Sequence, residues 1–114
     1  MEILNTTKNT VIADRVAVAD TSLSKMVGLL NRATFKEGEA LVIPSCRAIH
    51  MFFMKFPIDA IFVDKENHVV GCVSGIRPFS LSPVFWQASF VIEVPVGTIE
   101  TSKTKEGDLI ALKG

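Results

Sequence analysis

The feature that most constrains the fold is a long apolar run, Ile58–Val63, that leads into a polar turn. Successive side chains of a strand point to opposite faces, and this run is apolar on both faces apart from Asp59. Asp64–Asn67 offers turn residues, and a second strand-like run follows over residues 68–74. This pattern predicts a β-hairpin made of residues 58–64 and 68–74.

Short runs of β-branched residues recur along the rest of the chain, separated by residues that favour turns. Val16 and Val18 alternate with alanines, which is typical of a strand with one face tightly covered. Gly71 and Gly75, in the second arm of the hairpin, predict a bulge or a close approach by another segment. Beyond the hairpin, we expect strands at residues 3–4, 11–19, 40–43, 89–94 and 109–112.

One amphipathic helix is predicted at about residues 21–30. Side-chain oxygens at residues 20–22 can accept hydrogen bonds from its first free N–H groups. Its apolar residues follow the i, i+3, i+4, i+7 spacing of one helical face: Leu23, Met26, Val27 and Leu30. Residues 97–105 are expected to form a turn or a second short helix. We therefore predict a mainly β fold with one or two short helices, either an antiparallel sandwich or a small, partly open barrel.

Composition and charge indicate an ordinary globular protein. With 114 residues, 48% of them hydrophobic, the chain can bury a core, and we expect one domain over residues 1–114. Twelve basic and twelve acidic residues cancel, which predicts no binding to nucleic acid or to a membrane surface. No apolar run reaches the ~18 residues that span a bilayer, and residues 1–8 show no signal-peptide pattern. A cytoplasmic location is expected, and the oligomeric state stays open.

Reactive and ligating side chains interrupt the apolar stretch at residues 45–64. Cys46 and His50 could ligate a metal, but a further ligand is needed and no second Cys/His pair is present. They could also serve as nucleophile and base, which requires a lowered thiol pKa. We favour a buried thiol beside a hydrogen-bonded histidine, and we predict no metal and no cofactor. The other nearby metal-ligating side chains are Asp59, Asp64 and His68.

Two carboxylates, Asp59 and Glu93, each stand between apolar neighbours in a predicted strand. An ionised carboxylate in such a place costs several kcal/mol unless it is paired or hydrogen-bonded. Each is therefore either part of a structural ion pair or a group of a functional site, and we favour the structural pair. The basic residues that could serve as partners are Arg32, Arg47, Lys55 and Arg77.

Four short motifs follow one another along the chain: Gly28–Leu30, His50–Asp59, Val91–Gly97 and Gly107–Asp108. Together they resemble the domain of unknown function 192 family of small bacterial and archaeal proteins, over residues 11–112 of this chain. The resemblance implies a compact, mainly β, sandwich-like fold with a helix packed against it, and it brings no assigned chemistry. One motif departs from the family, which commonly has Phe-Trp-Met where this chain has Phe52-Phe53-Met54.

Three functions stay open at the level of the sequence. The first is a small-ligand binding module with a mostly apolar pocket near residues 46–59. The second is a hydrolase or isomerase with Asp59 or His50 as general base, so the sequence does not decide whether the protein is an enzyme. The third is an accessory protein that binds a protein partner through the apolar loop 78–86. The side chains expected to line the ligand pocket are His50, Met54, Lys55, Asp59 and Trp86.

Overall fold

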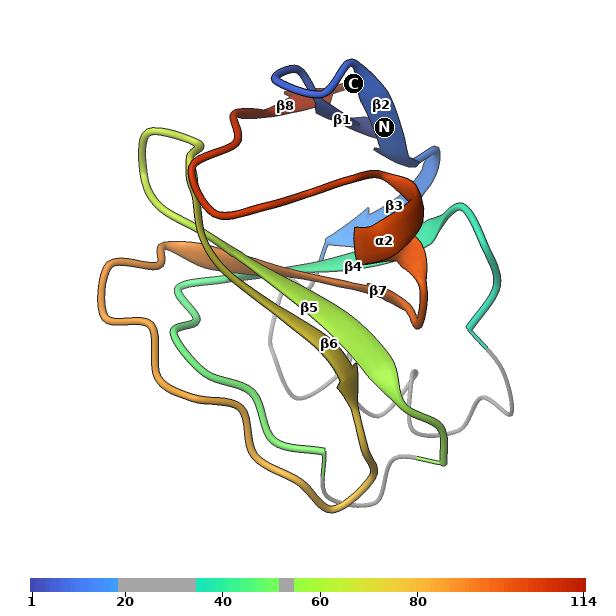
Figure 1. Cartoon of the computed structure of the whole chain (residues 1–114), viewed down its shortest axis with the longest axis vertical. Helices are drawn as coiled ribbons and strands as arrows, with labels where there is room; N and C mark the ends of the chain where they lie inside the picture. The colour runs from blue at the N-terminus through green and yellow to red at the C-terminus, as the bar shows by residue number, and fades with distance from the viewer. Residues whose placement is uncertain (19–34, 52–54) are drawn as a thin grey trace.

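The computed structural model describes residues 1–18, 35–51 and 55–114. This part of the chain forms eight strands and one short helix (Figure 1), and the helix expected at residues 21–30 lies outside it. No helix of the described part has the length and apolar character needed to cross a membrane. The elements are β1 (Glu2–Asn5), β2 (Thr10–Ala13), β3 (Arg15–Val18), β4 (Glu39–Pro44), β5 (Ile58–Val63), β6 (Val69–Ile76), β7 (Phe90–Pro95), α2 (Thr98–Thr101) and β8 (Ile110–Lys113).

The strands form two sheets. The larger sheet has five strands in the order β3-β4-β7-β5-β6, and the smaller sheet has three in the order β2-β1-β8. Among the described strands every pair is antiparallel except β3 with β4, which is parallel. The predicted mainly β, sandwich-like fold is therefore confirmed, and in the described part of the chain neither sheet closes into a barrel.

The hairpin predicted from the sequence is present as β5 and β6. Every residue of β5 is buried, because both faces of this strand are covered. One face belongs to a core shared with the smaller sheet and α2, which we call the helix-side core; it includes Ile3, Ile12, Ile61, Val63, Ile92 and Ile99. The other face belongs to the loop-side core, which includes Ile49, Met51, Ile58, Ala60, Phe62 and Val91.

One predicted strand is divided in two. The sequence indicated a single strand at residues 11–19, whereas the structure has β2 and β3 separated at Asp14. The N–H groups of Asp14 and Arg15 both donate to the Gly38 carbonyl, at 3.0 and 2.9 Å, and the chain passes there from the smaller sheet to the larger one. Gly38 has φ +87, a left-handed backbone conformation in which other residues are strained, so this junction favours glycine.

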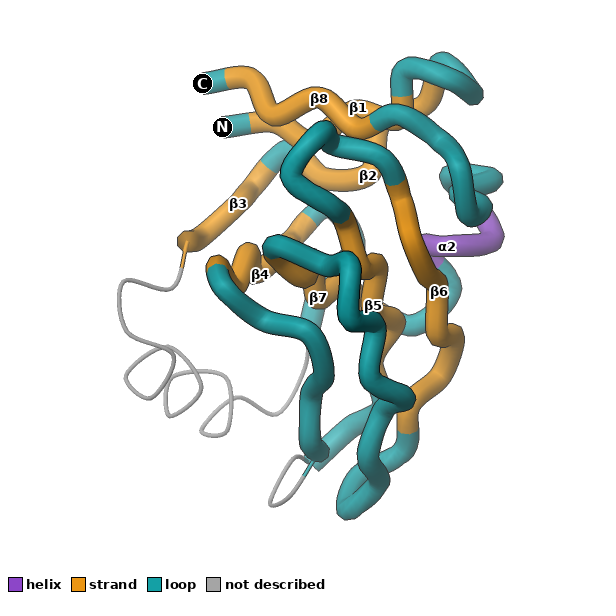
Figure 2. Tube along the Cα trace, turned by 90° about the vertical axis from the view of Figure 1, so that its left-hand side faces the viewer, coloured by secondary structure: helices purple, strands orange, loops and turns teal. Residues whose placement is uncertain are grey.

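Two connections, residues 45–51 and 77–89, cover the loop-side core and run beside each other (Figure 2). The Met51 N–H and carbonyl both bond to backbone groups of the second connection, at 2.8 and 2.7 Å. The Ile49 carbonyl accepts from the Ser82 N–H, and the Ile49 N–H donates to Ser82 Oγ, both at 2.9 Å. The two connections therefore form one hydrogen-bonded layer.

Gly71 lets this layer approach the sheet closely. The Phe85 ring occupies the space of a side chain there, because a Cβ on Gly71 would lie 2.1 Å from Phe85 Cε1. Phe85 also packs on Phe62, with ring centroids 4.4 Å apart. The predicted close approach at Gly71 is confirmed, and Gly75, with φ +62, lies where the pairing of β5 with β6 is irregular.

Gly71→Ala should destabilise the protein by about 1–3 kcal/mol, the usual cost of overpacking a core, because the new methyl group collides with Phe85. Urea unfolding followed by circular dichroism measures this loss. In the double variant with Phe85→Leu, the loss should be smaller than the sum of the two single losses. Gly114→Ala, where a Cβ meets nothing within 4 Å, is the control, and an equally small effect at Gly71 would contradict the close approach.

Candidate functional site

Asp59 is held by backbone groups on the helix-side face of β5, where it is 1% exposed. The Gly75 N–H donates to Oδ1 at 2.8 Å, and the N–H groups of Gly97 and Ile99 donate to Oδ2 at 3.1 and 3.0 Å. Gly97 is the N-cap residue of α2 and has no side chain with which to cap it. Asp59 therefore caps this helix from a strand that is distant in sequence.

These three hydrogen bonds stabilise the Asp59 carboxylate without a basic partner. Within the described residues no ion pair involves it, so backbone N–H groups take the place of the cation expected from the sequence. Both oxygens are occupied and the residue is shielded from solvent. The geometry thus supports a structural role for Asp59, which joins β5 to β6 and α2.

Two of the other predicted pocket residues, His50 and Trp86, belong to the connections 45–51 and 77–89 that cover the loop-side core. His50, Lys55 and Trp86 are all exposed, and Met54 lies outside the described residues. Asp59 faces the helix side of the larger sheet, where it bonds to Ile99. His50 stands between Ile49 and Met51, which pack in the loop-side core. The larger sheet therefore lies between Asp59 and His50. The structure therefore does not bring Asp59 and His50 together, as a hydrolase or isomerase using both would need.

Glu93 has the least compensated charge of the predicted site residues. It lies in β7, the middle strand of the larger sheet, and is in register with Leu41 on one side and Ala60 on the other. These neighbours belong to the loop-side core, and Glu93 is only 5% exposed. No described residue forms an ion pair with its carboxylate or donates a hydrogen bond to it. Burial raises the pKa of Glu93 to about 7.

Cys46 packs against the same loop-side core and is half-buried. Its thiol donates to the Ala48 carbonyl at 3.0 Å. Burial raises the pKa of the Cys46 thiol, and the negative charge of Glu93 raises it further. Because only the thiolate is a strong nucleophile, these surroundings do not favour Cys46 as a catalytic nucleophile, and they support its interpretation as a structural thiol.

The loop-side face around Glu93 therefore offers one titratable carboxyl group in apolar surroundings. Such a group can exchange a proton near neutral pH or, when ionised, pair with an N–H or cationic group of a ligand. Sequence reasoning noticed Glu93 and ranked Asp59 above it. The two carboxylates look alike in sequence, because nothing in the local pattern shows which one meets backbone N–H donors.

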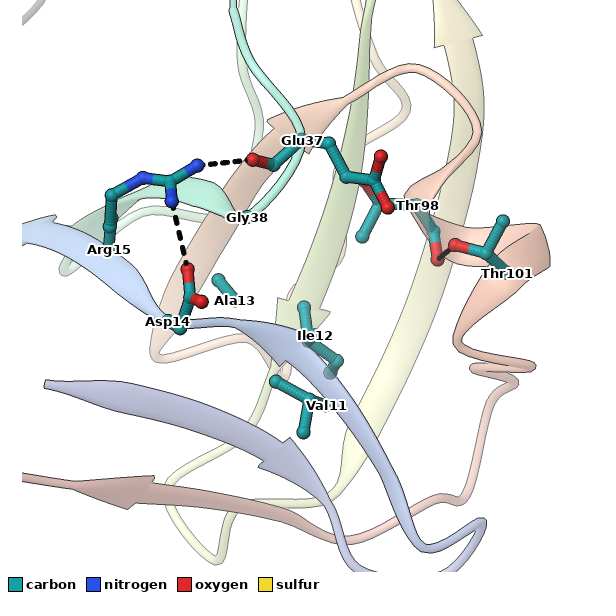
Figure 3. A pocket seen from close by; sticks show the side chains of 9 residues that line it. All are labelled: Val11, Ile12, Ala13, Asp14, Arg15, Glu37, Gly38, Thr98 and Thr101. Carbon is teal, nitrogen blue, oxygen red and sulfur yellow. Dashed lines mark hydrogen bonds and ion pairs between the residues drawn. The ribbon is translucent and has the colours of Figure 1, made fainter.

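A cleft of about 390 Å³ lies between the β2–β3 junction, residues 37–38 and α2 (Figure 3). None of the residues predicted from the sequence lines it. Arg15 donates to the Glu37 carbonyl and lies 3.6 Å from the Asp14 carboxylate, so the guanidinium group in this cleft is already engaged. Sequence reasoning missed the cleft because segments far apart in the chain form it.

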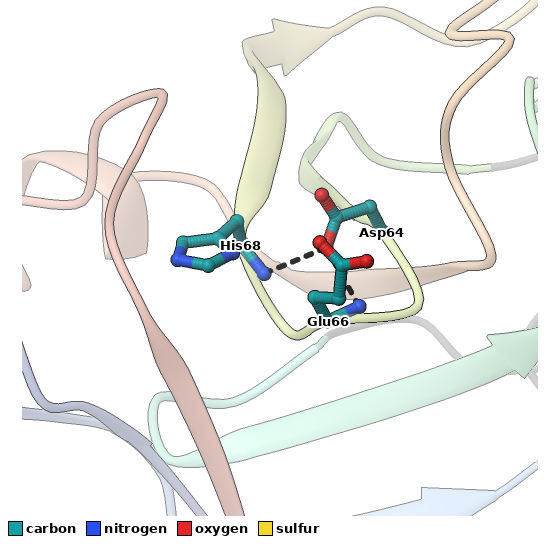
Figure 4. Close-up of side chains that lie close together, drawn as sticks. All are labelled: Asp64, Glu66 and His68. Carbon is teal, nitrogen blue, oxygen red and sulfur yellow. Dashed lines mark hydrogen bonds between the residues drawn. The ribbon is translucent and has the colours of Figure 1, made fainter.

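The turn of the β5–β6 hairpin brings together Asp64, Glu66 and His68 (Figure 4), whose ligand atoms lie within 4.8 Å of one another. Asp64 Oδ1 accepts hydrogen bonds from the N–H groups of Glu66 and His68, both at 2.9 Å. These bonds explain the geometry as that of a turn stabilised by an aspartate side chain. Cys46 and His50, the pair considered for metal binding, are not part of this group.

The loop proposed from the sequence as a partner-binding segment is exposed. Phe79, Leu81 and Trp86 present most of their surface to solvent, whereas Phe85 is partly buried against Phe62. The accessory-protein hypothesis requires exposed apolar side chains in this loop, and they are present. That the loop binds a protein partner stays a prediction.

Asp59→Asn should lower the free energy of unfolding by about 3 kcal/mol, since hydrogen bonds to a charged group contribute about 1.5–3 kcal/mol each. The amide keeps one acceptor oxygen and turns an NH₂ group towards buried N–H donors. Urea unfolding at neutral pH measures the loss. Asp14→Asn, at a side chain that is 59% exposed, is the matched control, and similar small losses in both variants would contradict the capping role.

Glu93→Gln should flatten the pH dependence of stability. Burial raises the pKa of Glu93 from 4.5 to about 7, so between these values the folded state holds a proton that the unfolded state has lost. Stability from this residue is therefore present at low pH and decreases as pH rises through this window, by on the order of 3 kcal/mol.

Urea unfolding of wild type and Glu93→Gln, below and above this window, measures the effect. The variant should gain stability relative to wild type as the pH rises. Glu106→Gln, at an exposed carboxylate, should keep the wild-type profile. Parallel profiles for wild type and Glu93→Gln would contradict the raised pKa.

Comparison with known proteins identifies relatives along nearly the whole chain. The sequence profile of the domain of unknown function 192 family, described as an uncharacterised ACR, matches residues 3–112. A UPF0127 protein of Thermococcus kodakarensis is 36% identical over 113 residues, which cover 96% of this chain and 71% of that protein. A UPF0127 protein of Pyrococcus abyssi is 33% identical over 114 residues, with 95% of this chain and 94% of that protein covered.

A solved structure shares the fold. The crystal structure of a protein of unknown function from Novosphingobium aromaticivorans aligns with a TM-score of 0.80 at 22% identity. The alignment covers 97% of this chain and 82% of that one. At this identity the likeness shows the fold alone, whereas the family profile spans both sheets. The chain therefore belongs to the domain of unknown function 192 family.

Proposed function

We propose that this protein is a small-ligand binding module that holds its ligand on the loop-side face of the larger sheet, with Glu93 as the polar anchor. The observation that carries the proposal is a carboxyl group buried among apolar side chains of the larger sheet, whose pKa is raised by burial to about 7. Such a group costs free energy in the folded protein, and a ligand with a complementary donor would offset that cost. Asp59 has no such need, because three N–H groups already bind it.

The surroundings of Glu93 favour a ligand with an apolar body and one amine, amidine or amide N–H group. Leu41 and Ala60 flank the carboxylate within the sheet, and small-molecule sites typically combine apolar walls with a few polar groups. Residues 46–51 pack on this face, and we place the proposed pocket beneath them, in the region near residues 46–59 named from the sequence. His50, Lys55 and Trp86, exposed on that side, would lie at its rim.

Enzymatic activity is less well supported than binding. A hydrolase or isomerase would have Glu93 as its acid–base group on this face, since Asp59 is engaged on the other face. General acid–base catalysis needs a partner group that completes the reaction, and Cys46, with its raised thiol pKa, is a poor nucleophile for that purpose. We therefore place binding first.

Thermal unfolding in the presence of a series of alkyl and aryl amines, with the matching alcohols as controls, tests the proposal. An amine present at 100 times its Kd should stabilise the wild-type protein by about 2.7 kcal/mol, which raises Tm by several degrees, whereas its alcohol should not. Glu93→Gln should remove this shift and Glu106→Gln should keep it. No shift with any amine, or a shift that survives Glu93→Gln, would contradict the proposed anchor.

A further inference from the structure

The three most exposed large apolar side chains of the described residues lie in one connection. Trp86 is 76% exposed, Leu81 67% and Phe79 66%. Figure 1 shows that this connection and residues 45–51 run from the end of the molecule opposite the two chain termini along one flank to β7 and β4. We call residues 45–51, 55–57 and 77–89 the loop end. Several exposed apolar side chains on one short segment indicate an interaction surface more often than single scattered ones do.

The loop end is also basic. Arg47, Lys55 and Arg77 are exposed there, and the segments 44–58 and 74–89 contain no aspartate or glutamate. The twelve basic and twelve acidic residues balance only over the whole chain. The prediction from the sequence that the protein does not bind membranes relied on this zero net charge. In the folded protein, however, the loop end carries basic residues and no acidic ones.

We propose that the loop end docks on an anionic lipid surface. Tryptophan and phenylalanine settle at the boundary between headgroups and acyl chains, and neighbouring Lys and Arg attract acidic headgroups. Entry into this water-poor layer requires that backbone N–H and C=O groups be paired. Part of the loop end meets this requirement internally, because Arg47, Ile49 and Met51 all bond to backbone groups of the connection 77–89.

Other occupants fit the loop end less well. A second copy of the chain would bring basic side chains against basic side chains, which costs free energy. An acidic protein would match the charge, but a protein interface also needs a closely complementary apolar core. Here the exposed apolar side chains belong to a connection between strands, and a fluid lipid surface accepts exposed groups without shape complementarity.

Trp86 makes the test direct, because it is the single tryptophan of a chain that has no tyrosine. Vesicles of phosphatidylcholine mixed with phosphatidylserine should move its emission to shorter wavelength and should sediment the protein. Vesicles of phosphatidylcholine alone should bind roughly 100-fold more weakly, because each of the three basic residues near an anionic surface strengthens binding about fivefold.

Variants in the loop end and in β8 distinguish specific docking from non-specific association with vesicles. Arg47→Gln with Arg77→Gln should weaken binding to the anionic vesicles roughly 30-fold, and Leu81→Ser should weaken it as well. Lys113→Gln and Leu112→Ser, at exposed residues of β8, are the matched controls and should bind like wild type. Circular dichroism verifies that each variant is folded.

Three results would overturn the proposal: unchanged emission with anionic vesicles, equal losses in the loop-end and β8 variants, or the same emission shift with soluble poly-L-glutamate in place of lipid. The last result would identify an acidic protein as the occupant of the loop end. Loss of vesicle binding with retained amine binding at Glu93 separates this surface from the proposed ligand site.

Discussion

Burial of β5 on both faces is the constraint on which the rest of the structure depends. All six residues of this strand are buried, so the larger sheet needs a covering layer on each side. The smaller sheet and α2 supply one layer, and the hydrogen-bonded connections 45–51 and 77–89 supply the other. Any charged side chain on the inner strands must therefore find its compensation inside one of these two cores.

The two carboxylates on those strands meet this requirement differently. Asp59 faces α2 and accepts three backbone hydrogen bonds, which makes it part of the framework. Glu93 faces the loop-side core, where the described residues offer it no donor. A carboxyl group that burial makes costly near neutral pH gives up stability, and the ligand recognition proposed above is a function that fits a carboxyl group among mostly apolar side chains.

Sequence periodicity predicted most of the described fold because strands and turns have local signals. The hairpin of β5 and β6 follows from an apolar run, a polar turn and a second run, and the close approach at Gly71 follows from a glycine inside a strand. The division of residues 11–19 did not follow, because it depends on the distant Gly38 carbonyl. The roles of Asp59 and Glu93 were hidden for the same reason: their local patterns match, and what distinguishes them lies across the tertiary structure.

Titration of Glu93 itself tests most directly whether burial, with no hydrogen-bond donor, sets the pKa of its carboxyl group. Carbon-13 NMR of the side-chain carboxyl, assigned by comparison with Glu93→Gln, follows protonation at this one residue. We expect a midpoint near 7, raised by burial from the ordinary value of 4.5. A midpoint at or below the ordinary value would mean that a donor already holds the carboxylate, and Glu93 would then be a second structural group like Asp59.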